Sequence, residues 1–406
     1  MNTGSDQTKP APPRLLSLDA LRGFDMLMIL GADELVYALQ KTRDTSLTRF
    51  LVAQFDHADW AGCRFYDLIF PLFIFMVGMS VVFSLGKHLA SGDRASAYRR
   101  VVRRFVVMYL LALIYYGGVS QPWPDIRLTG VLNRIAVCYL FASLIFLHVR
   151  WKGIVGITAG LLVGYWALMT FVPFPDLRPR NGAGELISPA LTATNVAQLN
   201  WSSTNQLRGV FDKGVNLANY VDQKYLPGFK WDGTWDPEGI LSTLPAVATC
   251  LLGVLAGLLM RRSDLSDQRK VLWLAGAGVV CVAAGWLWHL QFPVIKKIWT
   301  SSYVLVAGGW SLLLFAAFHQ VIEIWQWRRW ATPFLWIGTN AITLYLGSNF
   351  VEPMHLARRL AGGDVSQFLN TAVGQGTGDL VLVAVALGLL LLLARFLYQR
   401  KIFLRV

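Results

Sequence analysis

The hydrophobic positions of this chain form long, nearly uninterrupted runs rather than the short alternating patterns of soluble proteins. A helix needs roughly 20 predominantly apolar residues to cross a bilayer. Runs of about that length lie at residues 15–39, 65–86, 101–118, 130–147, 153–172, 239–260, 271–290, 302–322, 333–352 and 379–397. The pattern predicts an all-α, polytopic membrane protein with about ten transmembrane helices, in which residues 15–406 form a single transmembrane domain.

Two polar segments lie outside these runs. Residues 1–14, MNTGSDQTKPAPPR, are polar and proline-rich, so we expect a disordered cytoplasmic tail without a cleavable signal peptide. Residues 173–237 form one long loop, and loops of that length are usually functional or disordered. Its aromatic residues fit either an ordered lid on the outer face or an interfacial aromatic belt. They are Trp201, Tyr220, Tyr225, Phe229, Trp231 and Trp235.

The composition agrees with a membrane protein. Hydrophobic residues make up 55% of the 406 positions and charged residues only 15%, whereas soluble chains carry about a quarter charged residues. The formal net charge is +13, but Lys and Arg gather in alternate loops, as expected for loops that stay in the cytoplasm. We therefore predict that both termini are cytoplasmic, that the 173–237 loop is outside, and that nucleic acid is not a partner.

The cysteine pattern does not indicate a metal site. Cys63, Cys138, Cys250 and Cys281 stand apart in the sequence, without a CxxC pair. The chain also lacks the His, Cys and carboxylate spacing that is typical of zinc sites. We expect four free thiols and no metal.

The first apolar run carries five charged residues, Asp19, Arg22, Asp25, Asp33 and Glu34. A charge at the bilayer centre costs about 2.5 to 3.5 kcal/mol on insertion scales. Asp19 and Arg22 are three residues apart and can pair, and Arg22 and Asp33 are separated by close to three whole helical turns. One interpretation is a polar groove that crosses the membrane. The alternative is that these residues lie at the two interfaces, which leaves only Asp25 to be explained.

A histidine with carboxylate neighbours follows in the first outer loop. His57 is flanked by Asp56 and Asp59, and Asp67 comes ten residues later. Imidazole titrates near neutral pH, and a nearby carboxylate can hold it in one tautomer, so this pattern is typical of a general base. The alternative is a solvated loop histidine. Pro71 lacks the N–H that would bond the Asp67 carbonyl, which leaves a backbone acceptor free at the start of the second run.

Three other stretches place polar groups near membrane helices. Asp236 and Glu238 lie at the outer mouth of the sixth run, where helix capping is the alternative interpretation. Asn133 and Arg134 begin the fourth run. Asn340 lies within the ninth, and an amide in the middle of a membrane helix must bond another helix or a ligand.

Seven blocks of sequence resemble, in order, one family of membrane enzymes. They are SLDALRGFDM, HADWAGCRFYDLIFPLFIFMVG, GVLNRIAVCYL, WDPEGILSTL, KKIWTSSYV, PFLWIGTNAITLYLG and RKIFLRV. From Arg14 onward the chain resembles the transmembrane acyltransferases typified by heparan-alpha-glucosaminide N-acetyltransferase and its bacterial relatives. The resemblance implies transfer of an acetyl group from cytosolic acetyl-CoA, as co-substrate, to an amino sugar on the opposite face. It also implies that the active-site histidine is His57, in the block that matches HADWAG.

The chemistry of this transfer suggests roles for the remaining candidates. The catalytic set is His57 with Asp33 or Asp67 to orient it. His57 would take the proton either directly from the sugar amine or after acting as a transient acetyl carrier. Substrate contacts are expected from the backbone near Pro71, from the aromatic loop residues, and from Asn340, Asn133, Arg134, Asp236 and Glu238. The phosphates of CoA need cations on the inner face, and the candidates are Arg103, Arg104, Arg261 and Arg262. The sequence departs from the family pattern at Asp33, where the pattern has Asn, and at Ser348 and Asn349, where it has a His-Glu pair.

Two rival hypotheses remain at this stage. A carrier would move an amino sugar or oligosaccharide unmodified and would use Asp25, Asp33 and His57 as a proton-coupled site; a structural or regulatory protein would have kept the fold without the activity. The predicted partners are an amino sugar or glycan acceptor, the lipid bilayer and a second copy of the chain in a homodimer. The resemblance implies an integral protein of the bacterial inner membrane.

Overall fold

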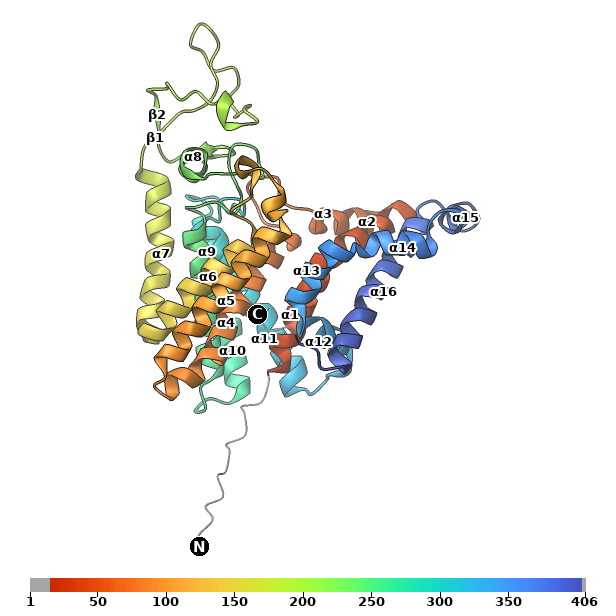
Figure 1. Ribbon diagram of the computed structural model, residues 1–406. Coiled ribbons are helices and arrows are strands. Elements are labelled where there is room, and N and C mark those ends of the chain that lie inside the picture. Colours follow the sequence, from red (N-terminus) through yellow and green to blue (C-terminus); the bar gives the residue numbers. More distant parts are fainter. Residues whose placement is uncertain (1–14, 404–406) are drawn as a thin grey trace.

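The computed structural model describes residues 15–403 and is built almost entirely from helices (Figure 1). The first half contains α1 (Leu16–Leu27), η1 (Met28–Ala32), α2 (Asp33–Thr42), α3 (Ser46–Phe55), η2 (Phe65–Leu68), α4 (Ile69–Ala90), α5 (Arg94–Tyr115), η3 (Gly118–Ser120), η4 (Trp123–Asp125), α6 (Val131–His148), α7 (Trp151–Phe171), β1 (Phe174–Pro175) and η5 (Val196–Gln198). The second half contains β2 (Gln206–Leu207), β3 (Phe211–Asp212), β4 (Val215–Asn216), α8 (Leu217–Tyr225), α9 (Thr243–Met260), α10 (Asp267–Trp288), α11 (Ser301–His319), η6 (Gln320–Ile324), η7 (Arg329–Ala331), α12 (Thr332–Gly338), α13 (Ala341–Val351), α14 (Pro353–Ala361), α15 (Asp364–Ala372) and α16 (Thr377–Gln399). The tail predicted for residues 1–14 lies outside the described residues.

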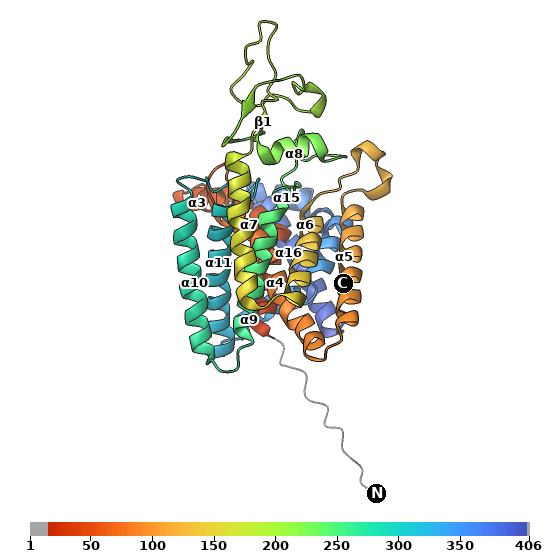
Figure 2. The same ribbon diagram turned by 90° about the vertical axis from the view of Figure 1, so that its left-hand side faces the viewer.

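Within residues 15–403, eight helices are long and apolar enough to cross a membrane. They lie at Phe65–Ala90, Arg94–Ser120, Val131–His148, Trp151–Phe171, Thr243–Met260, Asp267–Trp288, Ser301–Ile324 and Thr377–Gln399. The first seven run side by side in one bundle (Figure 2), whereas α16 packs against α2, α12 and α14. The all-α, polytopic membrane fold is thus confirmed. The other two runs of the sequence, the first and the ninth, are helices that are interrupted partway.

The first run is interrupted at Gly31. The backbone there has φ +132°, a conformation that is open to glycine and strained for other residues, and it lies in the π-helical turn η1 that joins α1 to α2. The second interruption falls between α12 and α13, at Thr339 and Asn340, where Asn340 leaves the helical region with φ −128° and ψ 27°. Each interruption lines a cavity of the bundle, where membrane proteins tolerate irregular backbone.

Glycine residues let the central helices approach closely. A Cβ at Gly78 on α4 would lie 1.9 Å from the Cys250 carbonyl oxygen on α9, and a Cβ at Gly253 would lie 1.9 Å from the Phe75 carbonyl oxygen. Gly23 on α1 and Gly338 on α12 make the same kind of contact with each other's helix. Small residues at such crossings permit the backbone packing that stabilises helix pairs in lipid.

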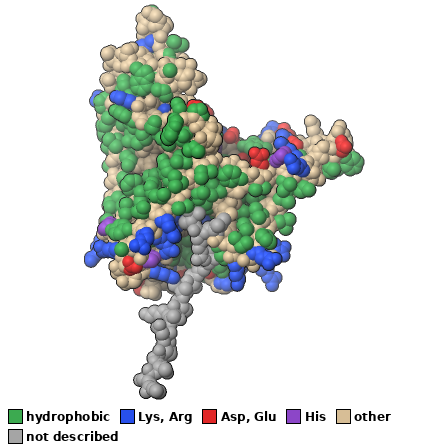
Figure 3. Space-filling model, viewed as in Figure 1, with side chains coloured by type: hydrophobic (Ala, Val, Ile, Leu, Met, Phe, Trp, Pro, Cys, Tyr) green, Lys and Arg blue, Asp and Glu red, His purple; other side chains and the backbone are tan. Residues whose placement is uncertain are grey.

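The long loop forms a cap at one end of the bundle, above α7 and α9 (Figure 1). Two short antiparallel pairs, β1 with β2 and β3 with β4, and helix α8 give it local structure. We call this end of the molecule the loop side. Figure 3 shows clusters of Lys and Arg side chains at the opposite end, which we call the basic side.

Substitution of Gly253 by Val is expected to destabilise the α4 and α9 pair by about 1–3 kcal/mol, because the added Cβ would overlap the Phe75 carbonyl. The matched control is Gly276→Ala on α10, where a Cβ would meet nothing within 4 Å, and no loss is expected. Thermal unfolding of the detergent-solubilised proteins measures both. An unchanged midpoint for Gly253→Val would show that the close crossing does not limit stability.

Candidate active site

His57, Asp67 and Lys296 meet at the loop side of the bundle. The Nδ1 atom of His57 lies 2.9 Å from Oδ1 of Asp67, so the two residues that sequence spacing proposed as partners are in direct contact. The Lys296 ammonium lies 3.3 Å from the same carboxylate oxygen and 3.0 Å from Nδ1 of His57. The side chain of Asp67 is only 1% exposed, whereas that of His57 is 51% exposed. A buried carboxylate thus holds two basic groups at a surface that a substrate can reach.

The loop between α3 and η2 wraps around the Asp67 carboxylate. Oδ2 of Asp67 accepts hydrogen bonds from the backbone N–H groups of Ala58 at 3.1 Å and Arg64 at 3.0 Å. The Tyr303 hydroxyl, on α11, donates to the Asp67 carbonyl at 2.6 Å. Pro71 therefore does leave this carbonyl free of a helical partner, but Tyr303 occupies it. The prediction that this backbone would contact the substrate is wrong for the Asp67 carbonyl.

His57 and Lys296 line a cavity of about 230 Å³ that extends into the bundle. Apart from these two residues, Glu238 and Tyr66 at the loop side, the wall is mostly apolar. It is made of Met26, Ile29, Ile69, Phe70, Phe73, Val131, Leu132, Ile135, Ile342 and Tyr345. We call this space the histidine cavity.

Two further cavities adjoin the histidine cavity. The arginine cavity, of about 310 Å³, shares Phe73 and Ile342 with it. The acidic cavity, of about 540 Å³, shares Ile29 and Tyr345 with it. The three spaces therefore form a series through the protein, separated only by shared side chains.

One stripe of the first helical run follows this series. Arg22 lines the arginine cavity, Met26 and Ile29 line the histidine cavity, and Asp33 lines the acidic cavity. The sequence hypothesis that Arg22 and Asp33 lie on one polar path is supported by this placement. Asp19 pairs with Arg22 at 2.9 Å, as its spacing predicted.

Four arginines line the arginine cavity, Arg22, Arg100, Arg103 and Arg104. Arg103 and Arg104 form no ion pair with any carboxylate of residues 15–403, and Arg104 stacks on the Tyr139 ring at 4.7 Å. Uncompensated cations at a cavity favour an anionic ligand such as phosphate. Arg22 and Arg100 were not among the sequence candidates for this role, because nothing in their local sequence distinguishes them from other inner-face cations.

The other two predicted cofactor residues lie away from this cavity. Arg261 donates to the Val82 carbonyl at 3.4 Å, and Arg262 forms an exposed ion pair with Asp264. Their contacts are those of helix-end residues on the basic side, and the prediction that they join Arg103 and Arg104 in one pocket is wrong. A basic residue next to a membrane helix is common to all such loops, which is why the sequence pattern could not separate them.

The acidic cavity is lined by charged and polar side chains at the loop side. Its polar lining is Asp33, Glu34, Ser348, Glu352, His355 and Arg358. Asp33 lies beside the hydroxyl of Tyr66, whose ring is 5.1 Å from the His57 ring. Asp33 therefore neighbours the histidine through Tyr66, while Asp67 is the carboxylate that touches it. Ser348 lines this cavity, whereas Asn349 donates to the Tyr115 carbonyl at 3.0 Å.

Two vertebrate relatives and one family model match this chain. The family model described as heparan-alpha-glucosaminide N-acetyltransferase, catalytic, covers residues 14–206, which include His57 and Asp67. The human protein named heparan-alpha-glucosaminide N-acetyltransferase is 25% identical over 389 residues, covering 84% of this chain and 53% of that protein. The mouse protein of that name is 23% identical over 395 residues, covering 87% and 56%. The chain is similar to these two proteins over most of its length. It spans about half the length of the curated relatives it matches.

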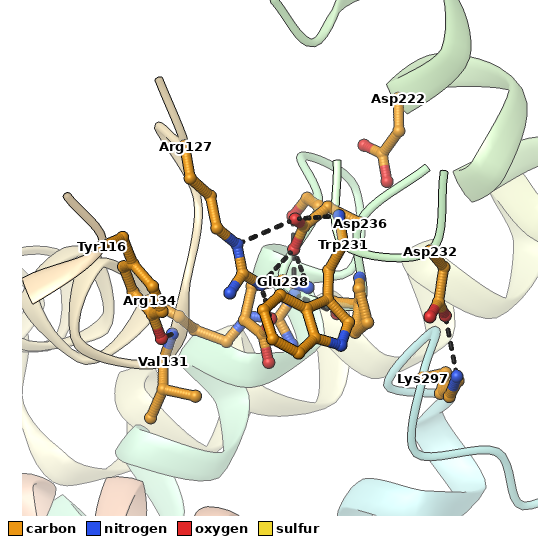
Figure 4. A network of polar contacts seen from close by, with 12 residues as sticks. Tyr116, Arg127, Val131, Arg134, Asp222, Trp231, Asp232, Asp236, Glu238 and Lys297 are labelled. Atoms are coloured by element: carbon orange, nitrogen blue, oxygen red, sulfur yellow. Dashed lines mark hydrogen bonds and ion pairs between the residues drawn. The ribbon is translucent and has the colours of Figure 1, made fainter. Parts of the chain in front are cut away.

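Several predicted substrate residues of this chain hold the cap to the bundle. Asp236 accepts two hydrogen bonds from Arg127, and Glu238 accepts one at 2.9 Å (Figure 4). Arg134 donates to the Pro237 carbonyl at 2.9 Å and to the Ser242 hydroxyl. Both carboxylate oxygens of buried Asp236 are thus occupied by protein partners, which contradicts a direct role in substrate contact. Arg134 bonds the protein only through Nη2, and its Nε and Nη1 have no hydrogen-bond partner among the described residues, so its role in substrate contact stays a prediction. Glu238 also lines the histidine cavity and remains a candidate for that role.

Two buried amides lack hydrogen-bond partners in the described part of the chain. Both side-chain polar atoms of Asn133 and of Asn340 are unpaired, and each residue is 2% exposed. Asn340 lines the arginine cavity, at the interruption between α12 and α13. An unpaired amide facing a cavity is suited to bind a ligand, as the sequence predicted for Asn340. Asn133 follows Val131 and Leu132, which line the histidine cavity, but does not line it itself.

The aromatic residues of the cap divide into anchors and surface groups. Trp235 is 2% exposed and packs edge-on against Trp60, whose indole N–H donates to the Phe211 carbonyl at 2.8 Å. Trp231 and Tyr225 are about 60% exposed. The cap is an ordered structure over the loop that carries His57, while stacking of its exposed rings on a sugar stays a prediction.

The described residues contain no cluster of three or more His, Cys, Asp or Glu side chains that could hold a metal ion. All four cysteines are free thiols. His57, Lys296 and Asp67 are residue types suited to proton transfer and charge stabilisation.

Asp222 on α8 is a buried carboxylate that joins the cap to the start of α9. Its Oδ1 accepts the Ile240 backbone N–H at 2.8 Å, and its Oδ2 lies where a Cβ on Gly239 would be. Burial raises the pKa of Asp222 to about 7. The cap attachment therefore holds a titratable group that is protonated in mildly acidic conditions.

Replacement of Asp222 by Asn is expected to change the pH dependence of stability. Because the pKa of Asp222 is about 7 in the folded protein and 3.8 in a free side chain, the folded state binds the proton more tightly, and stability falls as pH rises from about 4 to about 7. Asn cannot lose a proton and avoids this loss. Thermal unfolding at pH 5 and pH 8 should show the variant gaining a few degrees relative to wild type at pH 8. An equal difference at both pH values would contradict the assignment.

Proposed function

We propose that this chain is a membrane-embedded acyltransferase that moves an acetyl group from cytosolic acetyl-CoA to the amine of a glucosamine-type sugar on the outer face. The observation that carries the proposal is the position of His57. It opens into a cavity that adjoins an arginine-lined space toward the basic side and an acidic space toward the loop side. A donor and an acceptor that enter from opposite faces can both reach this one residue.

The arginine cavity suits the donor. The phosphates of CoA are multiply charged, and the guanidinium groups of Arg103 and Arg104 have no carboxylate partner in the described chain. The thioester end of the donor would pass Asn340 and then Phe73 and Ile342, the side chains shared with the histidine cavity. The mostly apolar wall beyond them suits an uncharged acyl and pantetheine chain.

The acidic cavity suits the acceptor. Asp33, Glu34 and Glu352 line it at the loop side, and carboxylates attract the ammonium form of an amino sugar. Tyr66 lies between Asp33 and the His57 ring. An amine held at Asp33 would thus approach the histidine across Tyr66, from the side opposite to the donor.

The contacts of His57 support a role as general base. When Nδ1 carries the proton and donates to Asp67, Nε2 is left as the acceptor. The bound ammonium first releases one proton to water. The neutral amine then attacks the thioester carbonyl, the new C–N bond forms, and Nε2 takes the second proton that the nitrogen sheds. The C–S bond then breaks and the proton passes to the thiolate, which leaves as CoA. Asp67 stabilises the imidazolium while it exists.

The positions of the termini follow from the same proposal. Lys and Arg gather on the basic side (Figure 3), and the positive-inside rule assigns such an end to the cytoplasm. We therefore place both termini and the arginine cavity in contact with the cytosol, and the cap on the outer face of a bacterial inner membrane. We also infer that residues 15–406 act as one domain, and that a homodimer is the form to test.

Replacement of His57 by Ala is expected to lower acetyl transfer by at least about 100-fold, because the general base is lost. The test uses protein in liposomes with labelled acetyl-CoA and glucosamine-type acceptors, followed by mass spectrometry. Asp59→Asn is the matched control, since Asp59 lies in the same loop with a side chain that is 96% exposed. Accumulation of unmodified sugar without dependence on CoA would reject the enzyme and favour a carrier.

Removal of positive charge from the arginine cavity is expected to weaken the binding of acetyl-CoA more than it slows the transfer of the acetyl group. Arg103→Ala with Arg104→Gln should raise the KM for acetyl-CoA by about 10- to 100-fold, the equivalent of one or two charge-assisted hydrogen bonds. Arg262→Ala, which removes a cation of the same face but outside the cavity, is the control. Equal effects of both changes on KM would argue that the donor does not bind in this cavity.

A further inference from the structure

We propose that Lys296 is a catalytic residue of this site, and that its ammonium group binds the thioester carbonyl oxygen and stabilises the negative charge that forms there. The inference rests on the proposed acyl transfer and adds the group that the sequence candidates lacked. A tetrahedral centre with a charged oxygen must form when an amine attacks a thioester, and a positioned cation or N–H donor lowers its energy.

The position of Lys296 matches this role. Its ammonium lies along the edge of the imidazole ring, 3.0 Å from Nδ1 and 3.4 Å from Nε2 of His57. It also lines the histidine cavity, with its side chain only 21% exposed. The amine that gives its proton to Nε2 is bonded to the acyl carbon at that moment. The acyl group is therefore also next to the Lys296 ammonium. The rest of the cavity wall is mainly apolar, so a carbonyl oxygen finds few other donors there.

The charges around Lys296 balance both before and during the reaction. The titratable groups that face it are His57, Asp67, Glu238 and Cys63. At rest, the Lys296 ammonium lies 3.3 Å from the Asp67 carboxylate, and these two opposite charges offset each other. When the tetrahedral centre forms, one positive charge appears on His57 and one negative charge on the oxygen. These two new charges cancel, so the net charge of the site does not change, and the negative oxygen lies beside the Lys296 ammonium.

Burial makes the proton of Lys296 easier to lose than that of an exposed lysine. It lowers the pKa of Lys296, and the neighbouring Asp67 carboxylate offsets only part of this effect. Because a neutral amine would stabilise the oxygen far less than an ammonium, transfer should decline when Lys296 deprotonates at alkaline pH. This gives the proposal a pH-dependent consequence.

The turn that carries Lys296 is held in a strained conformation. Trp299 has φ +51°, which bulky side chains rarely adopt, and its backbone N–H donates to the Lys296 carbonyl at 2.9 Å. Its buried indole donates to the Thr249 hydroxyl at 3.1 Å and receives the Arg134 guanidinium on its face. Strain of this kind persists when surrounding contacts enforce it, and it is frequent at functional sites. Here those contacts fix the backbone from which Lys296 reaches the histidine.

The atoms balance without any further reactant. The C–N bond forms, the C–S bond breaks, and one proton moves from the amine through His57 to the thiolate sulfur. Lys296 keeps its proton throughout and acts only by its charge and hydrogen bond.

The neighbouring lysine provides a matched control. Lys297 is on the same turn, but it pairs with Asp232 at 2.7 Å and lies over the Trp235 ring, outside the histidine cavity (Figure 4). Removal of its charge tests the effect of losing a lysine from this turn without changing the cavity.

The experiment compares wild type, Lys296→Met, Lys296→Arg and Lys297→Met in detergent, where both faces are accessible, with acetyl-CoA and glucosamine from pH 6 to pH 10. Lys296→Met is expected to lower kcat by about 100-fold or more, with the KM for acetyl-CoA within about threefold of wild type. The alkaline decline in wild-type kcat should move to higher pH in Lys296→Arg, because guanidinium keeps its proton. Lys297→Met should stay within about threefold of wild type in kcat, and thermal unfolding confirms that each variant is folded.

Two results would overturn the role of Lys296. One is a folded Lys296→Met protein with kcat within threefold of wild type, and the other is an alkaline decline that is unchanged in Lys296→Arg. Absence of product from folded wild type is a different result, because it rejects the proposed acyl transfer itself.

Discussion

The buried carboxylate of Asp67 is the group on which the arrangement of the site depends. Removing a carboxylate from water is costly unless hydrogen bonds and opposite charge replace its hydration. This one is satisfied by the imidazole of His57, the ammonium of Lys296 and the backbone N–H groups of Ala58 and Arg64. The hydrogen bonds and the ion pair of this one side chain therefore fix the first loop, the start of α4 and the turn after α10 relative to one another.

The membrane imposes a related constraint on the path that leads to this carboxylate. Polar side chains and unpaired backbone groups are tolerated at membrane depth when they face a cavity rather than lipid. The interruption at Gly31 borders the acidic cavity, and the interruption at Asn340 borders the arginine cavity. Arg22 and Asp33 lie at opposite ends of the same helical stripe. The features that make the first and ninth runs poor membrane helices are thus the ones that line the path between the two faces.

The cap shows how far local sequence can mislead about function. Asp236, Glu238 and Arg134 were candidates for substrate contact because they lie at the ends of predicted membrane helices. Two of the three instead hold the cap in place through hydrogen bonds with Arg127 and with backbone carbonyls. A charged side chain in a membrane protein can pair with another protein group or with a substrate. Only the fold shows which of these two partners it has.

The sequence by itself determined the helical class and the positions of the apolar spans, and it proposed Asp33 or Asp67 as the carboxylate partner of His57. The first two are local properties, since the apolar length of a run decides whether it can cross a bilayer, whereas the fold decided that Asp67 is the partner in direct contact. Only the tertiary structure decided that Lys296, 239 positions after His57, touches it. It also decided that Arg103 and Arg104 line a cavity while Arg261 and Arg262 do not. Contacts between distant loops depend on how the helices pack against one another, and no periodicity along the chain encodes that packing.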